Sequence, residues 1–172
     1  MPEQSAGSGG RPRRRIGVLL AVALVVLALD VTTKLVAVAE LQGRAPVEVV
    51  DGLLTLRLVR NPGAAFGVAQ GLTIALTAIA VVVILVILRI ARRLRSGPWA
   101  VGLGMVLGGA VGNLVDRVFR EPGPFRGHVV DFLELPHWPV FNLADSAIVC
   151  GGILLVVLSV RGISYDGQRP AA

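Results

Sequence analysis

Residues 99–118, WAVGLGMVLGGAVGNLVDRV, form an apolar run that is long enough for a helix to cross the hydrocarbon core of a membrane. Glycines at positions 104, 108 and 112 recur at four-residue spacing, which places them on one face of a helix. A ladder of small residues allows a neighbouring backbone to approach closely. The stretch therefore predicts a membrane-spanning helix that packs tightly against another span.

Three further apolar runs of similar length flank this stretch. They lie at about residues 16–38, 72–88 and 140–160. Of the 172 residues, 54% are hydrophobic and only 16% are charged, whereas about 25% is usual for a soluble domain. We expect an all-α membrane protein, in which four transmembrane helices form a bundle within a single membrane domain at residues 16–161.

Arginines orient the chain in the membrane. Dense Arg clusters precede the first run and follow the second, and Arg161 follows the last. Because positive residues flank the cytoplasmic ends of spans, both termini are predicted to be cytoplasmic, with residues 40–68 and 119–139 as outer loops. Residues 1–15 and 162–172 are expected to be cytoplasmic tails, the first disordered. The net charge of +6 is explained by membrane orientation, so no nucleic-acid partner is expected.

The first outer loop contains two short segments of β type. VEVV at 47–50 and LLTLRLV at 53–59 are rich in β-branched residues or Leu, and Asp51-Gly52 between them favours a turn. They predict a small extracytoplasmic β-sheet. The segment continues into NPGAAFG at 61–67, a loop of turn formers and small residues.

Polar residues collect at the outer ends of the predicted spans. At about 1.5 Å per residue, Asp30 lies about 21 Å and Asp116 about 26 Å from the inner face of a core of about 30 Å. Asp145 lies near the outer start of the last run, and Asp131 lies in the loop before it. Such a layer at one depth indicates a functional site, because the inner halves of the runs carry almost no polar residues. The other members of the layer are Lys34, Asn61, Asn113, Arg117 and Asn142.

Sequence spacing suggests partners for some of these charges. Asp30 and Lys34 are four residues apart, so on a helix they share a face and can form an ion pair. That pair serves either a functional site or a structural link between helices. Arg117 can pair with Asp116, which would leave Asp131 and Asp145 as the unpaired acids.

Two close carboxylates have a specific chemical use. Repulsion raises one pKa of such a pair, so that the two groups share a proton at neutral pH. The ionised member takes a proton from water while the protonated member hydrogen-bonds the scissile carbonyl, as in aspartic peptidases, without metal or cofactor. The sequence contains no HExxH, no Cys/His zinc cluster and no Gly-x-Ser-x-Gly. Its single cysteine, Cys150, is expected to be a buried apolar side chain.

Two other functions are compatible with charged residues inside the spans. A small proton- or ion-coupled transporter would use them, but it would place polar residues along its whole pore. A non-enzymatic assembly or lipid-binding protein would not require two unpaired acids at one depth. The residues alone also leave Asp116 as a candidate for the catalytic pair, because it lies at a suitable depth.

Five motifs make the sequence resemble the lipoprotein signal peptidase family, also called signal peptidase II. The resemblance implies a four-span bundle with a small extracytoplasmic sheet and a short helix in the second outer loop. It implies an endopeptidase at the outer face of the bacterial cytoplasmic membrane. Its partners would be membrane lipid and prolipoproteins carrying diacylglyceryl-cysteine, which it would cleave just before that cysteine. The motifs are Asp30-x-x-x-Lys34, NPGAAFG at 61–67, GGAVGNLVDR at 108–117, VVDF at 129–132 and FNLADS at 141–146.

The resemblance also implies roles for individual residues. Asp131 and Asp145 would be the catalytic aspartates. The interval between them is short for the family, so the helix of this loop is expected to be curtailed. Pro62, where Thr is frequent, is expected to stiffen its loop. The Arg, Ala, Val and Gly bias suggests a GC-rich bacterium. Asn61, Asn113, Arg117 and Asn142 would contact substrate or the cyclic peptide inhibitor globomycin, and Asp30, Lys34 and Asp116 would support the site.

Overall fold

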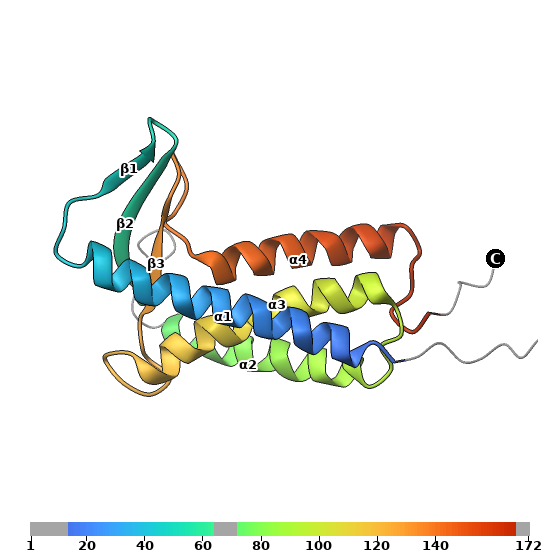
Figure 1. Cartoon of the computed structure of the whole chain (residues 1–172). Coiled ribbons are helices and arrows are strands. Elements are labelled where there is room, and N and C mark those ends of the chain that lie inside the picture. The colour runs from blue at the N-terminus through green and yellow to red at the C-terminus, as the bar shows by residue number, and fades with distance from the viewer. Residues whose placement is uncertain (1–13, 64–71, 168–172) are drawn as a thin grey trace, which may run out of the picture.

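The computed structural model describes residues 14–63 and 72–167. Four helices form a bundle, and a small sheet stands at one end of it (Figure 1). All four are long and apolar enough to cross a membrane, which confirms the predicted bundle. The outer parts of both tails and most of NPGAAFG lie outside the described residues. The helices are α1 (Ile16–Leu41), α2 (Leu72–Ala91), α3 (Gly97–Phe119) and α4 (Leu143–Val160).

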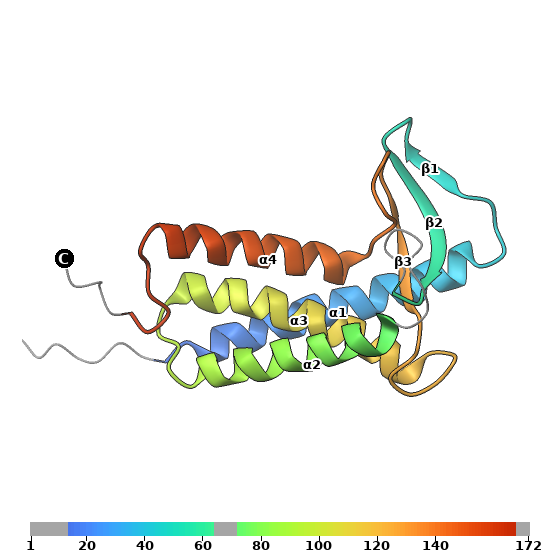
Figure 2. The same cartoon turned by 180° about the vertical axis from the view of Figure 1, so that it is seen from behind.

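Helix α3 lies between the other helices (Figure 2). In its membrane-spanning window 56% of the residues are buried, against 17–22% in the other three helices. The predicted glycine ladder explains this position. A Cβ added at Gly104 would lie 2.8 Å from the carbonyl oxygen of Leu19 on α1. A Cβ added at Gly108 would lie 2.7 Å from the carbonyl oxygen of Ala23, also on α1. The close neighbour predicted from the ladder is therefore α1.

A second set of glycines brings α4 against α3. A Cβ added at Gly109 would lie 2.5 Å from the carbonyl oxygen of Ala144, in the first turn of α4. Farther along, a Cβ at Gly151 of α4 would lie 2.8 Å from the carbonyl oxygen of Gly102. Glycine on both helices thus lets the backbones approach on a second face of α3.

The outward faces of the bundle are apolar and exposed. Leu24 on α1, Leu85 on α2 and Val156 on α4 are each more than half exposed. An exposed apolar surface of this extent fits lipid rather than water. Cys150 is also exposed on α4, so the expectation that it is buried was wrong. In a membrane span an apolar run does not distinguish the core face from the lipid face.

The sheet contains β1 (Val47–Val50), β2 (Leu54–Asn61) and β3 (Val129–Glu134) in the antiparallel order β1-β2-β3. The predicted sheet is confirmed, and Gly52 takes the left-handed conformation, with φ 64°, in the turn between β1 and β2. The third strand was not predicted. The described second outer loop contains β3 and no helix, so the short helix implied there was wrong. Its β-branched residues Val129 and Val130 pair instead with the end of β2.

The two ends of the described chain lie together, at the opposite end of the bundle from the sheet (Figure 1). The segment that follows α4 returns to the turn between α2 and α3. There the Tyr165 carbonyl oxygen accepts hydrogen bonds from the backbone N–H groups of Arg95, at 2.9 Å, and Ser96, at 3.1 Å. Trp99 Nε1 donates to the Ile163 carbonyl oxygen at 2.6 Å. The C-terminal segment is thereby attached to the start of α3.

Candidate active site

The residues predicted to share one depth meet at the end of the bundle where the sheet joins the helices (Figure 1). Several parts of the fold supply them. Helix α1 carries the Asp30–Lys34 pair, α3 carries three of the residues, and the loop strands and the start of α4 carry the rest. All nine belong to one connected set of contacts, described below. They are Asp30, Lys34, Asn61, Asn113, Asp116, Arg117, Asp131, Asn142 and Asp145.

Lys34 lies at the base of this set. Its Nζ contacts Asp30 Oδ2 at 2.8 Å, Asp116 Oδ2 at 2.9 Å and Asn113 Oδ1 at 2.9 Å. These three acceptors match the three protons of an ammonium group. The side chains of Lys34 and Asp30 are 1% and 0% exposed, and charges buried this deeply are stable only when they are paired. The predicted Asp30–Lys34 pair is present, and it extends to Asp116.

Asp116 has different partners from those predicted. Its Oδ1 accepts a hydrogen bond from Arg120 Nε, whereas Arg117 donates from Nη1 to the Asn113 carbonyl oxygen at 3.2 Å. The expected Asp116–Arg117 pair was wrong because adjacent helical residues point in different directions, while residues four apart share a face. The i, i+4 spacing of Asp116 and Arg120 was the available signal for this missed residue.

Asp30 and Asp116, the two acids that contact Lys34, also accept hydrogen bonds from the main chain. Asp30 Oδ1 accepts the Ala144 N–H at 2.9 Å, and Asp116 Oδ2 accepts the Val130 N–H at 3.2 Å. Ala144 and Val130 immediately precede the two aspartates that were predicted to be catalytic. Because Lys34 contacts both acids, its buried ammonium group is linked through them to the backbone immediately before each candidate aspartate.

Asn142 contacts both members of the candidate pair. Its Nδ2 donates to Asp131 Oδ1 at 2.6 Å, and its backbone N–H donates to Asp145 Oδ2 at 3.2 Å. Asn142 is also the N-cap of α4, because its Oδ1 accepts the Asp145 N–H at 3.0 Å. This reciprocal capping box places the Asp145 side chain in the first turn of α4.

Two further asparagines complete the hydrogen bonding of the pair. Asn61 Nδ2 donates to Asp131 Oδ2 at 2.8 Å, and Asn113 Nδ2 donates to Asp145 Oδ1 at 2.7 Å. Asn61 is itself oriented by the Gly63 N–H, which donates to its Oδ1 at 2.8 Å. Among the ion pairs of the described residues, none includes Asp131 or Asp145. The two aspartates are therefore held by the amide groups of three asparagines, which was not predicted from the sequence.

Burial changes the acidity of Asp131, whose side chain lies on β3 and is 1% exposed. The pKa of Asp131 is raised to about 6. Desolvation is the main cause of the rise, and the negative charge of Asp145 is a smaller one. The hydrogen bonds from Asn61 and Asn142 and the positive charge of Lys34 lower the pKa and offset part of the rise. A carboxyl group with this pKa can hold a proton near neutral pH.

Sequence reasoning also missed Gly127, which lies against the end of α3. Its N–H donates to the Arg117 carbonyl oxygen at 2.9 Å, and a Cβ would approach the Arg120 carbonyl oxygen to 2.7 Å. The absent side chain lets the loop return closely over the end of α3 and enter β3 just before Asp131. No local signal marked this residue, because it lies eight residues after Phe119, the last residue of α3, and therefore beyond the C-cap position.

The described residues contain no group of three or more His, Cys, Asp or Glu side chains that could hold a metal ion. Asp30 and Asp116 are both contacted by the ammonium group of Lys34, and Asp116 is also contacted by the guanidinium group of Arg120. The halves of the four helices that lie away from the sheet, at residues 16–28, 80–88, 97–108 and 150–160, carry no acid and no lysine. This distribution gives no support to the transporter alternative.

Comparison with known proteins gives a consistent result. The family model described as "Signal peptidase (SPase) II" matches residues 22–161. The lipoprotein signal peptidase of Mycobacterium avium is 55% identical over 100% of this chain and 97% of its own length. That of Rhodococcus jostii is 57% identical over 91% of this chain and 79% of its own length. Together with Streptomyces, these relatives are GC-rich actinobacteria, as the composition suggested.

Solved structures share the fold. A bacterial membrane enzyme, 24% identical, matches with a TM-score of 0.76 over 95% of this chain and 99% of that chain. A second, 25% identical, gives the same TM-score of 0.76 over 88% of this chain and 98% of that chain. With the family model covering most of the sequence, the chain belongs to the signal peptidase II family.

Proposed function

We propose that the protein is an aspartic endopeptidase that removes the signal peptide from prolipoproteins carrying diacylglyceryl-cysteine, with Asp131 and Asp145 as the catalytic pair. The observation that carries the proposal is that Asn142 donates hydrogen bonds to both carboxyl groups. These carboxyl groups come from separate segments, and neither is used in an ion pair of the described residues. Family membership supports the substrate class.

The environments of the two aspartates support different roles. Asp131 is buried and its pKa of about 6 suits the protonated member, which would donate a hydrogen bond to the scissile carbonyl oxygen. Asp145 lies in the first turn of α4, where the positive end of the helix dipole favours a negative charge. We therefore assign Asp145 the role of the ionised base.

The reaction then proceeds in two steps. Asp145 takes a proton from water, and the resulting hydroxide attacks the carbonyl carbon of the residue before the lipidated cysteine. The oxyanion of the tetrahedral intermediate is stabilised by the proton of Asp131. In the second step Asp145 returns its proton to the cysteine nitrogen as the carbon–nitrogen bond breaks, which releases the signal peptide and the lipidated amine.

The amide side chains orient the pair, because Asn61, Asn113 and Asn142 each donate to one of its carboxylates. Arg117 is placed differently. It donates one hydrogen bond, to the Asn113 carbonyl oxygen, and it interacts electrostatically with Asp145 and Asp131. We assign the remaining N–H groups of its guanidinium to a substrate carbonyl, or to a backbone carbonyl of a globomycin-type peptide.

The pair would lie at the outer face of the bacterial cytoplasmic membrane, with both chain ends in the cytoplasm. The arginines around both described ends support this orientation, since cytoplasmic flanks of spans are rich in Lys and Arg. The pair lies at the opposite end, where the helices meet the sheet. At that depth a diacylglyceryl group can remain among the lipid chains while the peptide bond before its cysteine reaches the aspartates.

Cleavage by the purified protein in detergent tests the proposal. The substrate is a prolipoprotein carrying diacylglyceryl-cysteine, and the same prolipoprotein without the lipid is the substrate control. Asp131→Asn and Asp145→Asn are each expected to lose at least about a thousandfold in rate, as expected for removal of a group required for chemistry. Asp51→Asn, in the exposed turn between β1 and β2, is the matched control and should cleave normally.

Two outcomes would contradict the catalytic assignment. One is an Asp131→Asn variant that cleaves at the wild-type rate while Asp116→Asn, correctly folded, does not. The other is wild-type cleavage that a chelator abolishes and an added metal ion restores. Thermal unfolding of each variant in the same detergent separates a loss of chemistry from a loss of fold.

A further inference from the structure

The end of the bundle opposite the aspartates contains a cavity of about 380 Å³. We call it the basic pocket. It lies beside the turn between α2 and α3, where the segment that follows α4 returns to the bundle (Figure 2). It is lined by Val86, Arg89, Ile90, Arg92, Arg93 and Tyr165.

One face of α2 and its following turn form one wall. Val86, Arg89, Ile90 and Arg93 are spaced i, i+3, i+4 and i+7, so they share a face where the chain stays helical. Val86 lies on the side of the helix middle, and Arg89, Ile90 and Arg93 follow toward the end of the helix. The arginines of the pocket form its positively charged rim, and Val86 and Ile90 form its apolar floor.

Tyr165 forms the opposite wall and is held firmly in place. Its carbonyl oxygen accepts two backbone hydrogen bonds from the α2–α3 turn, and its ring meets Trp99 edge to face with centroids 6.0 Å apart. Trp99 in turn donates to the Ile163 carbonyl oxygen. The pocket is therefore formed between two segments of the chain, and Trp99 at the start of α3 holds one of them in place.

The rim carries uncompensated positive charge. Arg89, Arg92 and Arg93 are exposed, and none forms an ion pair with a residue that the structure describes. The neighbouring acid, Asp166, accepts a hydrogen bond from Ser164 Oγ at 2.6 Å and does not line the pocket. The C-terminal end of α2 contributes a negative charge of about 0.5, which three guanidinium groups outweigh.

An apolar stripe continues from the floor of the pocket along the membrane-facing surface of α2. Ile79, Val82 and Val86 are all exposed and lie on one helical face. An acyl chain anchored at the pocket would run along this stripe. A free phosphate ion would use the rim but not the stripe.

We infer that the basic pocket binds an anionic phospholipid, with the phosphate of the head group between the arginines and an acyl chain along Val86, Val82 and Ile79. Basic pockets at the cytoplasmic ends of spans suit this class of ligand, because charge and apolar surface meet at the depth of the head groups. This site is separate from the peptidase site and does not depend on its chemistry.

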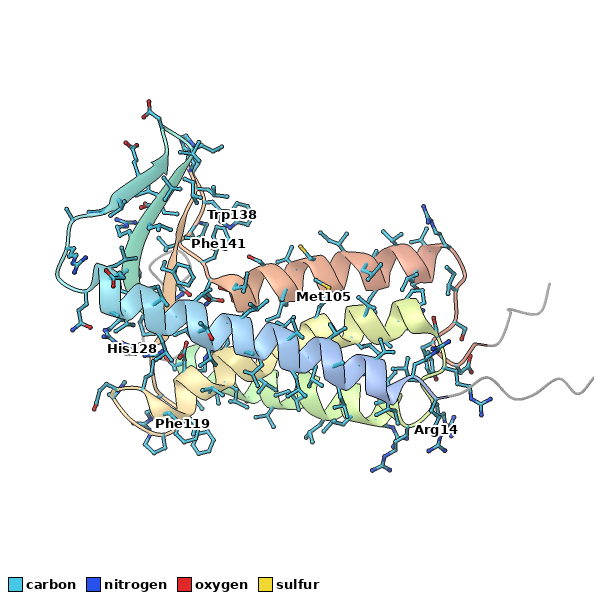
Figure 3. The ribbon with its side chains drawn as sticks, viewed as in Figure 1. Arg14, Met105, Phe119, His128, Trp138 and Phe141 are labelled. Carbon is cyan, nitrogen blue, oxygen red and sulfur yellow. The ribbon has the colours of Figure 1, made fainter. Side chains whose placement is uncertain are left out.

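Trp99 provides a local reporter, because it contacts Tyr165 of the pocket, whereas Trp138 lies at the other end of the molecule (Figure 3). The Trp138→Phe protein is reconstituted in phosphatidylcholine vesicles that contain increasing amounts of phosphatidylglycerol with brominated acyl chains. Bromine quenches tryptophan fluorescence at contact distance. Saturable quenching of Trp99 at low phosphatidylglycerol content is expected, and brominated phosphatidylcholine should give none.

Charge-matched variants separate a site from general attraction. In this background Arg92→Gln/Arg93→Gln is expected to raise the half-saturating phosphatidylglycerol content about tenfold or more. Arg14→Gln/Arg161→Gln removes the same charge from exposed residues near the same end that do not line the pocket, and it should change the value much less than the pocket variant does. Equal shifts for the two variants would mean diffuse attraction and would overturn the inference.

A third variant tests the pocket without changing its charge. Val86→Phe enlarges a half-exposed floor residue, and it is expected to weaken saturable quenching to the same degree as the arginine variant. Displacement of the lipid by millimolar inorganic phosphate would identify an ion site and would overturn the assignment to lipid. Trp99 quenching that is linear in phosphatidylglycerol content would overturn it as well.

Discussion

Lys34 carries the only positive charge that contacts both Asp30 and Asp116 among the described residues. Replacing it with Met would leave two buried carboxylates close together, and breaking such a buried pair costs about 3–5 kcal/mol of unfolding free energy. Lys34→Met should therefore lower the stability measured by thermal unfolding in detergent. The double variant Asp30→Asn/Lys34→Met should recover part of the loss, because it removes the acid left without a cation, whereas Asp116 keeps Arg120 as its partner.

The matched control is the other i, i+4 ion pair of α1, between Glu40 and Arg44. Both of these side chains are exposed, so Arg44→Met should leave the unfolding free energy nearly unchanged. If Lys34→Met were no more destabilising than Arg44→Met, the buried ammonium would not be the element that holds the two acids.

The acidity of Asp131 predicts how cleavage depends on pH. With a pKa of about 6, Asp131 loses the proton required for its proposed role as pH rises through 6, so kcat/KM of the free enzyme should fall over that range. The Asn61 hydrogen bond stabilises the carboxylate and lowers its pKa. Asn61→Ala should therefore move the alkaline limb of the pH–rate profile to higher pH. A limb that moves to lower pH would contradict the roles assigned to the two aspartates.

At the scale of the element, α4 begins with a residue that has two separable tasks. Asn142 caps the helix through Oδ1 and holds Asp131 through Nδ2. Asn142→Ala removes both, and the lost cap alone should cost about 1 kcal/mol of stability. Asn142→Ser retains a capping oxygen but has no amide donor for Asp131. We expect Ser to restore most of the stability and little of the cleavage rate, whereas equal recovery of both would show that only the cap matters.

The contact between α3 and α4 predicts an asymmetry between two glycines. A Cβ at Gly109 would lie 2.5 Å from the Ala144 carbonyl oxygen, whereas a Cβ at Gly152 would meet nothing within 4 Å. Gly109→Ala should separate the helices beside Asp145, cost about 1–3 kcal/mol of stability and slow cleavage. Gly152→Ala should leave cleavage unchanged and stabilise slightly, because Ala is the better helix former. Thermal unfolding and cleavage assays on both variants check this.

Elements that depend on residues close together in the sequence could be predicted, whereas pairing between distant segments could not. The spans follow from the length of apolar runs, and a close neighbour for α3 follows from a glycine ladder within one helix, although the ladder does not specify that this neighbour is α1. Strand β3 was missed because its pairing with β2 joins residues from different loops, such as Asp131 opposite Val59. The Arg120 contact was local and available, but adjacency was given more weight than helical periodicity. That Asn142 donates to Asp131 follows only from the folded geometry, since neither spacing nor residue type specifies an amide direction.

At the scale of the whole molecule, the proposed orientation can be tested in cells. In a Cys150→Ser background, Asp51→Cys lies in the exposed turn of the sheet and Arg161→Cys lies at the opposite end of α4. A membrane-impermeant maleimide should label the first in intact cells, and it should label the second only after the membrane is opened. The reverse pattern would place the aspartates at the cytoplasmic face and would contradict the proposed localisation.

The capping box of α4 has a consequence for resistance to inhibitors. An inhibitor that binds between Asp131 and Asp145 meets Asn142, whose side chain also terminates the helix. A bacterium that alters this residue to escape the inhibitor loses helix stability and the orientation of Asp131, a proposed catalytic acid, in the same step. Selection for resistance should therefore favour higher expression of the enzyme or exclusion of the compound over substitution at this position.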